Sequence, residues 1–181
     1  MASPAALNIN SFWRDAGYEK WFGKDEAFDA EIAQRFGSLV DDAAAGRLSE
    51  WEADAEGALA LLILLDQFPR NMFRGSARAF ATDEAARKVA DRAITNGFDQ
   101  QVDRAMRGFF YLPFMHSEAL ADQHRCVALY NAIDDANGVK YAIIHRDIIE
   151  RFGRFPHRNP ALGRAMTPEE EEFLKGDVFK G

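Results

Sequence analysis

The sequence predicts an all-α fold, on the basis of three observations. Apolar residues recur at intervals of three and four in several segments, which is the spacing of one face of an α-helix. No segment alternates β-branched and polar residues between turn signals, as a strand would. The run 58–65 is apolar at every position, so its helix has no face for water and should lie at the centre of a helical bundle. We expect about eight or nine helices and no sheet.

The segments before this central helix carry start and stop signals. Ser11 is expected to cap a short helix that carries Phe12 and Trp13, and the residues before it should be loose. Asp25 is a suitable N-cap for a second, amphipathic helix, which Gly46 should end.

Pro69 is expected to end the central helix, because its ring disfavours helical geometry at Phe68 and it has no backbone N–H. Asp66 then lies in the last turn, where the helix macrodipole disfavours a negative charge, so its carboxylate needs a cationic partner. Arg70 and Arg74 are nearest in sequence, but the proline should turn both away from the helix. A partner from elsewhere in the fold is therefore an equal expectation.

Two further helices are predicted after the central helix. Thr82 should cap the first of them, and Gly97 should end it. The second is expected from Asp99 to Phe110, and Pro113 should close it.

Three more helices complete the chain. The first begins after His116 and Ser117 and ends in a turn at Asn137 and Gly138, and the second covers 141–152 before the stop at Gly153. The last has the strongest start signal, in which Thr167 is the cap, Pro168 occupies the first helical position and Glu170 completes a capping box.

The composition indicates one domain without a membrane span. The chain has 181 residues, of which 48% are hydrophobic, enough for one well-buried core. Its net charge of -7 argues against general nucleic-acid binding, which uses a basic face. No signal peptide is recognisable, and no apolar run reaches the about 20 residues that cross a bilayer. We expect one cytoplasmic domain over 1–181 with an ordered core over about 11–174, and a buried, inert thiol at Cys126.

Motifs for metal, nucleotide and triad chemistry are missing from the sequence. His116 and His124 are too far apart to share a metal ion on one helix face, and no histidine follows a glutamate by three positions. No phosphate-binding glycine loop and no Gly-x-Ser-x-Gly elbow is present. We expect no metal and no cofactor, and we assign no catalytic residue.

The remaining polar residues cluster at helix ends and predict one composite site. Its arginines and histidines would bind a carboxylate or phosphate, because guanidinium groups match these anions with two parallel hydrogen bonds. The candidates are Asp66, Arg70, Asn71, Arg74, His116, Glu118, His145, Arg154, His157, Arg158 and Asn159. The alternative is that Asp66 and Glu118 neutralise the arginines in buried ion-pair networks that fix how helices cross.

Five motifs carry a resemblance to a known family. They are LLDQFPRNMFRG, AFATDEAAR, YLPFMHSE, HRDIIERFGRFPHRN and TPEEEEFL, in this order. At these motifs the chain resembles DUF924, a bacterial domain-of-unknown-function family of uncharacterised proteins, over almost everything from Phe12 to Leu174. The resemblance implies a fold similar to tetratricopeptide-repeat proteins, with stacked helical hairpins. It implies no reaction, cofactor or catalytic residue.

Three functions follow as hypotheses. The first is a cytoplasmic binding module whose Arg- and His-bearing corners accept an anionic small molecule or a peptide carboxylate. The second is a hydrolase in which His116 or His145 is the general base and the arginines stabilise developing negative charge. The third is a structural or protein-interaction scaffold that uses exposed aromatic residues. We expect no nucleic-acid or membrane partner, and the sequence leaves the oligomeric state open.

Overall fold

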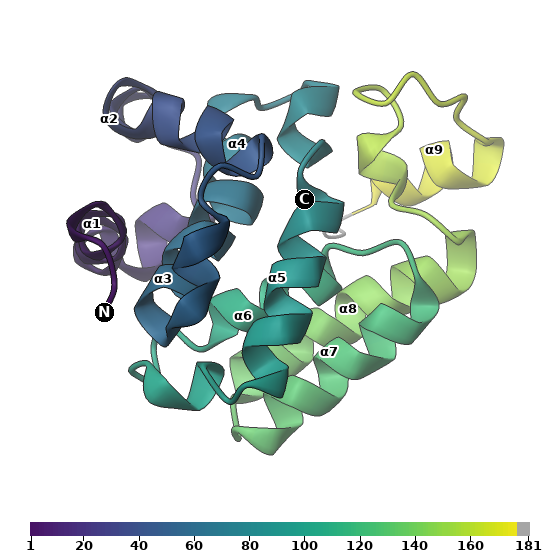
Figure 1. Cartoon of the computed structure of the whole chain (residues 1–181). Helices are drawn as coiled ribbons and strands as arrows, with labels where there is room; N and C mark the ends of the chain where they lie inside the picture. Colours follow the sequence, from purple (N-terminus) through teal and green to yellow (C-terminus); the bar gives the residue numbers. More distant parts are fainter. Residues whose placement is uncertain (177–181) are drawn as a thin grey trace. The chain divides into compact units, whose positions relative to one another are not determined.

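The computed structural model describes residues 1–176, and the regular secondary structure of these residues is all helical (Figure 1). Nine α-helical segments and several short 3-10 turns occur in this range, and none of its residues lies in a strand. The all-α prediction is therefore confirmed. The chain divides into two compact units, one formed by Met1–Arg74 with Arg78–Pro113 and the other by Gly75–Ala77 with the residues from Phe114 onward. The expectation of one domain over 1–181 stays a prediction.

The first unit, unit 1, contains the helices of the N-terminal half. They are α1 (Pro4–Phe22), α2 (Glu26–Ala44), α3 (Ala55–Leu62), α4 (Phe68–Met72) and α5 (Asp83–Thr95), with 3-10 turns at Ser49–Ala53 and Asp99–Gln101. A further 3-10 turn, Ala77–Phe80, belongs to unit 1 except for its first residue. The helix α6 (Gly108–Met115) starts in unit 1, and its last two residues belong to the second unit.

The second unit, unit 2, contains the C-terminal helices. They are α7 (Leu120–Ala132), α8 (Ala136–Phe152) and α9 (Pro168–Lys175), with a 3-10 turn at Pro156–Arg158. Helices α7 and α8 form a hairpin, and the 3-10 turn packs on α9. No helix in residues 1–176 has the length and apolar character needed to cross a membrane.

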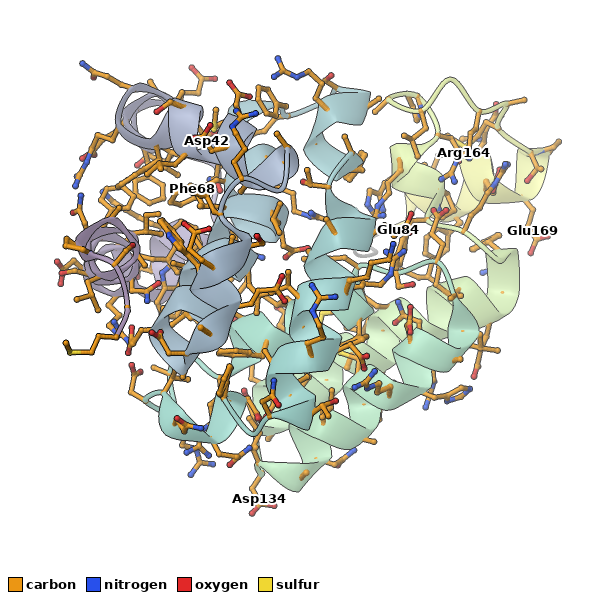
Figure 2. All side chains as sticks on the ribbon, in the orientation of Figure 1. Asp42, Phe68, Glu84, Asp134, Arg164 and Glu169 are labelled. Atoms are coloured by element: carbon orange, nitrogen blue, oxygen red, sulfur yellow. The ribbon has the colours of Figure 1, made fainter. Side chains whose placement is uncertain are left out.

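The core of unit 1 surrounds the predicted central helix. Every residue of 58–65 is at most 3% exposed, as the uninterrupted apolar run requires. This helix packs against α1 and α5. Beyond its end, Phe68 (Figure 2) is fully buried and stacks on Phe36 of α2, with ring centroids 5.2 Å apart. Trp13 of α1 meets Phe68 edge to face at 5.5 Å.

The central helix does not end at Pro69, contrary to the prediction. A π-helical turn at Ile63–Gln67 leads directly into α4, and Phe68 keeps helical dihedral angles. The missing N–H of Pro69 would otherwise serve the carbonyl of Leu65, four residues earlier. The hydroxyl of Thr82 donates to that carbonyl instead, at 2.5 Å. The helix tolerates the proline because a side chain from another segment replaces the lost donor.

Two other boundary predictions are also wrong, and one predicted capping bond is not formed. Helix α1 begins at Pro4, capped by Ser3, so Ser11 lies inside it and the preceding residues are helical because Ala6 and Ile9 are buried. Residues 99–110 do not form one helix, and Pro113 lies inside α6. Thr82 occupies the N-cap position of α5 but makes no capping bond, since its hydroxyl serves Leu65.

The predicted turn at Asn137 and Gly138 is the first turn of α8 instead. The carboxylate of Asp135 accepts from the N–H of Gly138 and caps the helix. A Cβ atom at position 138 would lie 2.1 Å from the Tyr130 ring, so the glycine allows α7 and α8 to approach closely here. Its role is packing rather than turn formation.

The other cap and stop signals are confirmed. Asp25 caps α2, and Thr167 with Glu170 forms the capping box of α9. Gly46, Gly97 and Gly153 follow their helices with positive φ angles. Cys126 is fully buried, and burial raises the pKa of its thiol.

We predict that Thr82→Val destabilises the protein by about 1 to 3 kcal/mol, because the buried carbonyl of Leu65 loses its donor. Urea unfolding followed by circular dichroism measures this change. Thr95→Val is the matched control, since the Thr95 hydroxyl also donates to a backbone carbonyl, that of Asp91, but on an exposed helix surface. Equal losses in both variants would contradict the role given to Thr82.

Candidate functional site

The predicted site residues fall into two sets, one in each unit. Unit 1 holds Asp66, Arg70, Asn71 and Arg74, and unit 2 holds His116, Glu118, His145, Arg154, His157, Arg158 and Asn159. The convergence of both sets on one site stays a prediction. The contacts within each set, however, show what most of the side chains do.

In unit 1 the π-turn carries a buried carboxylate, that of Asp66, which is 1% exposed. Arg70 lies 3.2 Å from this carboxylate, and the Gln67 amide donates to it at 2.6 Å. Arg70 also binds both carboxylate oxygens of Asp83, at 2.8 and 3.0 Å. The cationic partner predicted for Asp66 is therefore Arg70 itself, because the helix continues through Pro69 and keeps the two residues one turn apart.

Arg74 and Asn71 serve a second carboxylate of unit 1. Both oxygens of Asp29, in the first turn of α2, accept from Arg74 at 2.6 and 3.1 Å. The Asn71 amide donates to the same carboxylate at 2.7 Å. These bonds join the end of α4 to the start of α2, as the ion-pair alternative predicts for arginines at helix ends.

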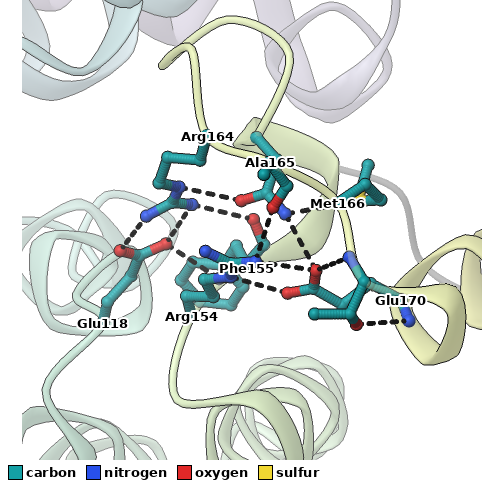
Figure 3. A network of polar contacts seen from close by, with 9 residues as sticks. Glu118, Arg154, Phe155, Arg164, Ala165, Met166 and Glu170 are labelled. Atoms are coloured by element: carbon teal, nitrogen blue, oxygen red, sulfur yellow. Dashed lines mark hydrogen bonds and ion pairs between the residues drawn. The ribbon is translucent and has the colours of Figure 1, made fainter.

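In unit 2 a connected polar network holds the segment that precedes α9 (Figure 3). Glu118 binds Arg164 through both carboxylate oxygens, at 2.7 and 2.9 Å. Arg154 binds Glu170 in the same two-bond manner, at 2.6 and 2.8 Å. Asn159 joins the two pairs, because it accepts from Arg164 at 2.8 Å and donates to Glu170 at 3.2 Å.

Glu170 is the most heavily engaged carboxylate of this network. It is 2% exposed and, besides Arg154 and Asn159, it accepts from the backbone N–H of Thr167. The hydrogen bond from Arg154, followed by those from Thr167 and Asn159, lowers the pKa of Glu170 to about 2. One side chain thus caps α9 and binds the segment that follows α8.

A separate cluster in unit 2 brings together three of the four histidines, two of which lie against Phe155. The rings of His116 and His145 lie 6.4 Å apart, and His145 meets the edge of the Phe155 ring at 5.6 Å. The ring centroids of His157 and Phe155 lie 5.6 Å apart, and the Arg158 guanidinium lies over the Phe155 ring at 4.5 Å. We call His116, His145, His157 and Arg158 the histidine cluster.

His145 is the buried member of the histidine cluster, at 5% exposure. Its Nδ1 lies 2.7 Å from the carbonyl oxygen of Tyr141. A carbonyl only accepts, so Nδ1 carries the proton and Nε2 carries the lone pair of the neutral ring. Burial, together with the nearby positive charges of His116, His157 and Arg158, lowers the pKa of His145 to about 3. The His145 ring is therefore neutral at physiological pH.

Gln123 of α7 fixes the backbone on both sides of His116. Its amide donates to the carbonyls of Met115 at 2.7 Å and Ser117 at 2.6 Å, with that of Phe114 at 3.3 Å. Ser117 also precedes α7 as predicted, and its hydroxyl donates to Asp122 at 2.6 Å. The position of His116 is thus set by a buried glutamine.

Sequence reasoning missed four residues of these networks as interaction partners. Asp29 and Asp83 lie in the first turns of helices, where acidic residues are common, so their positions give no sign of an arginine partner. The sequence indicates Glu170 only as part of a capping box and not as a partner of Arg154. Arg164 had no signal, because its partner Glu118 lies 46 positions away. Within residues 1–176, no three His, Cys, Asp or Glu side chains are grouped so that they would hold a metal ion.

We predict that His145 makes the free energy of unfolding fall as the pH is lowered from 7.5 to 5. Its folded-state pKa lies below 6.5, so the unfolded chain takes up the proton first, and the contribution present above pH 6.5 is lost as the pH falls towards 3. The loss amounts to at most about 2 kcal/mol at pH 5. Urea unfolding of wild type and His145→Asn at both pH values measures it, because asparagine retains a donor for Tyr141 but does not titrate.

The matched control for His145 is His124→Asn, since the His124 side chain is 57% exposed. The difference in the free energy of unfolding between wild type and His145→Asn should be smaller at pH 5 than at pH 7.5. The difference between wild type and His124→Asn should be nearly the same at both pH values. A difference between wild type and His145→Asn that grows as the pH is lowered to 5 would contradict the neutral, buried state of the His145 ring.

We predict that Glu170→Gln costs about 1.5 to 3 kcal/mol at pH 7, because Arg154 and Thr167 lose a charged acceptor. The depressed pKa means that the carboxylate stabilises the folded chain above about pH 4.5 and that this contribution is lost as the pH falls towards 2. The difference from wild type in thermal denaturation should therefore shrink in acid. Glu169→Gln, on the exposed side of the same turn, should show no such change.

Comparison with known proteins agrees with this architecture. A protein of unknown function from Agrobacterium tumefaciens has a solved structure that matches with a TM-score of 0.92 and 50% sequence identity, over 95% of this chain and 98% of that one. Comparison with curated proteins gives no match. The family described as bacterial protein of unknown function (DUF924) matches residues 9–177. The chain therefore belongs to the DUF924 family.

Proposed function

We propose that the protein binds the carboxylate or phosphate group of a small molecule or peptide, and that the histidine cluster of unit 2 is the binding site. The observation that carries this proposal is that two imidazoles and the Arg158 guanidinium lie against Phe155, with a third imidazole, that of His116, beside His145. Such a group offers several N–H donors and positive charge in a small volume. A cytoplasmic location, predicted from the sequence, is part of the same proposal.

The contacts of the other arginines favour this smaller site over the whole predicted set. Arg70 binds Asp66 and Asp83, Arg74 binds Asp29, and Arg154 binds Glu170. An arginine already bound to a carboxylate gives up that bond when a ligand replaces it, so it gains little by binding. We therefore assign these three arginines to the structural networks, and we include Arg158 in the site because its guanidinium lies over the Phe155 ring.

The electrostatics of His145 support the same assignment. A histidine loses its proton more readily when positive groups surround it, and three such groups lower its pKa here, after burial itself. An anion reverses that effect, because it neutralises the local charge. The cluster is therefore more favourable for an anion than for a cation.

The hydrolase hypothesis receives less support from this geometry. A general base works best when its pKa lies near the operating pH. The pKa of His145, lowered to about 3, makes its ring a weak base at neutral pH. The scaffold hypothesis, like the absence of nucleic-acid and membrane partners, stays a prediction.

We predict that acetate and inorganic phosphate bind to the protein and that Arg158→Gln weakens this binding about tenfold or more, because a charge-assisted pair of hydrogen bonds is lost. Titration of the 15N-labelled protein, followed by NMR, measures the dissociation constants. A short peptide with a free C-terminus and its amidated form distinguish a peptide carboxylate from a small anion as the preferred ligand.

Arg151→Gln is the matched control for this experiment. Arg151 also lies over an aromatic ring of unit 2, that of Phe152 at 4.7 Å, but it is half exposed and belongs to α8 outside the histidine cluster. Equal binding by wild type and Arg158→Gln, with both proteins folded, would overturn the proposed function.

A further inference from the structure

We infer that Glu118 and Arg164 are positioning residues of the histidine cluster, because together they hold both backbone polar groups of Phe155, the ring that the cluster shares. The expected effect of these residues on anion binding rests on the proposed function. Their effect on the placement of the Phe155 and His145 rings does not, because it concerns the protein without a bound anion.

Phe155 is the common contact of the cluster. His145 meets its ring edge to face, His157 lies beside it, and the Arg158 guanidinium lies over it. The Phe155 side chain is fully buried. A displacement of this ring therefore changes the surroundings of all three side chains.

The backbone of Phe155 is held by one ion pair. Its N–H donates to Oε1 of Glu118 at 2.8 Å. Its carbonyl oxygen accepts from Nη2 of Arg164 at 3.1 Å, and also from the N–H of Arg158 at 3.1 Å. Because Glu118 and Arg164 bind each other through two bonds, the N–H and the carbonyl of Phe155 are fixed as one unit.

The pair also relates Phe155 to His116. Glu118 lies two residues after His116, in the short segment that Gln123 fixes between α6 and α7. Glu118 therefore links the segment carrying His116 to the residue that contacts His145, His157 and Arg158. Burial is the largest single influence and raises the pKa of Glu118, but the hydrogen bonds from Arg164 and the Phe155 N–H, together with the positive charges of Arg164 and Arg158, outweigh burial and lower this pKa. The pair is thus charged at neutral pH.

Arg154 provides a natural comparison within the same network. The Arg154 guanidinium binds Glu170 through two bonds. Its further bond goes to the carbonyl of Ala165, whereas that of Arg164 goes to the carbonyl of Phe155. Each of these two guanidinium groups forms a two-bond fork with its carboxylate, and removal of either fork removes hydrogen bonds that hold the segment before α9. Loss of the Arg164 fork also removes one of the two bonds to the Phe155 carbonyl and the cationic partner of Glu118, whereas loss of the Arg154 fork leaves both in place.

The test compares Arg164→Lys with Arg154→Lys. Lysine keeps the charge but replaces the planar fork by a single ammonium, so Arg164→Lys should loosen Phe155 while both proteins remain folded. We expect the imidazole NMR signals of His145, recorded without anion, to shift in Arg164→Lys and to remain in place in Arg154→Lys. We expect acetate binding to weaken about tenfold in Arg164→Lys alone.

Glu118→Gln is the second variant, which keeps an amide oxygen for the Phe155 N–H but removes the charge that binds Arg164. It should shift the His145 signals less than Arg164→Lys does, with circular dichroism confirming the fold. Unchanged His145 signals in both Arg164→Lys and Glu118→Gln would overturn the inference, and so would equal shifts in Arg154→Lys. A wild-type protein that binds no acetate or phosphate would overturn the proposed function alone, because the His145 signals report ring placement without a ligand.

Discussion

Burial of one helix on every side is the constraint on which unit 1 depends. The residues 58–65 have no polar face, so α1, α5 and the turn before α3 must cover them. The same helix continues past Leu65 and carries Asp66 and Gln67 into the interior, at 1% and 5% exposure. Buried polar groups are costly without partners. Arg70 is the partner of the Asp66 carboxylate, and the Thr82 hydroxyl is the partner of the Leu65 carbonyl.

The π-turn reconciles a proline with an unbroken helix. Phe68 donates to the carbonyl of Ile63, five residues earlier, and the chain then resumes α-helical geometry in α4. Turns of this kind are frequent at functional sites. Here the turn keeps Arg70 one turn beyond Asp66, and the charged groups that it presents are bound to each other. Its visible role in unit 1 is therefore to join α4 with the start of α5.

The arginines of this acidic protein are used largely to join its own segments. Five of them form two-bond pairs with carboxylates that come from other helices or turns, namely Arg70 with Asp83, Arg74 with Asp29, Arg92 with Glu52, Arg154 with Glu170 and Arg164 with Glu118. Planar guanidinium forks suit such partly buried pairs better than ammonium groups do. An arginine-rich sequence is thus a poor guide to ligand binding by itself. The histidine cluster differs because three of its four members contact one aromatic ring, that of Phe155, and the fourth, His116, lies beside His145.

The sequence by itself determined the helical class, the buried central helix and most helix ends. Those features depend on local chemistry, such as apolar spacing, the capping box at Thr167 and the left-handed geometry of Gly153. It also identified the residues of the histidine cluster, although not their arrangement. The tertiary structure alone decided that the helix passes Pro69, because the donor for Leu65 comes from Thr82, 17 positions away. It likewise decided which carboxylate each arginine binds, since pairs such as Glu118 and Arg164 are brought together by folding and leave no trace in local sequence.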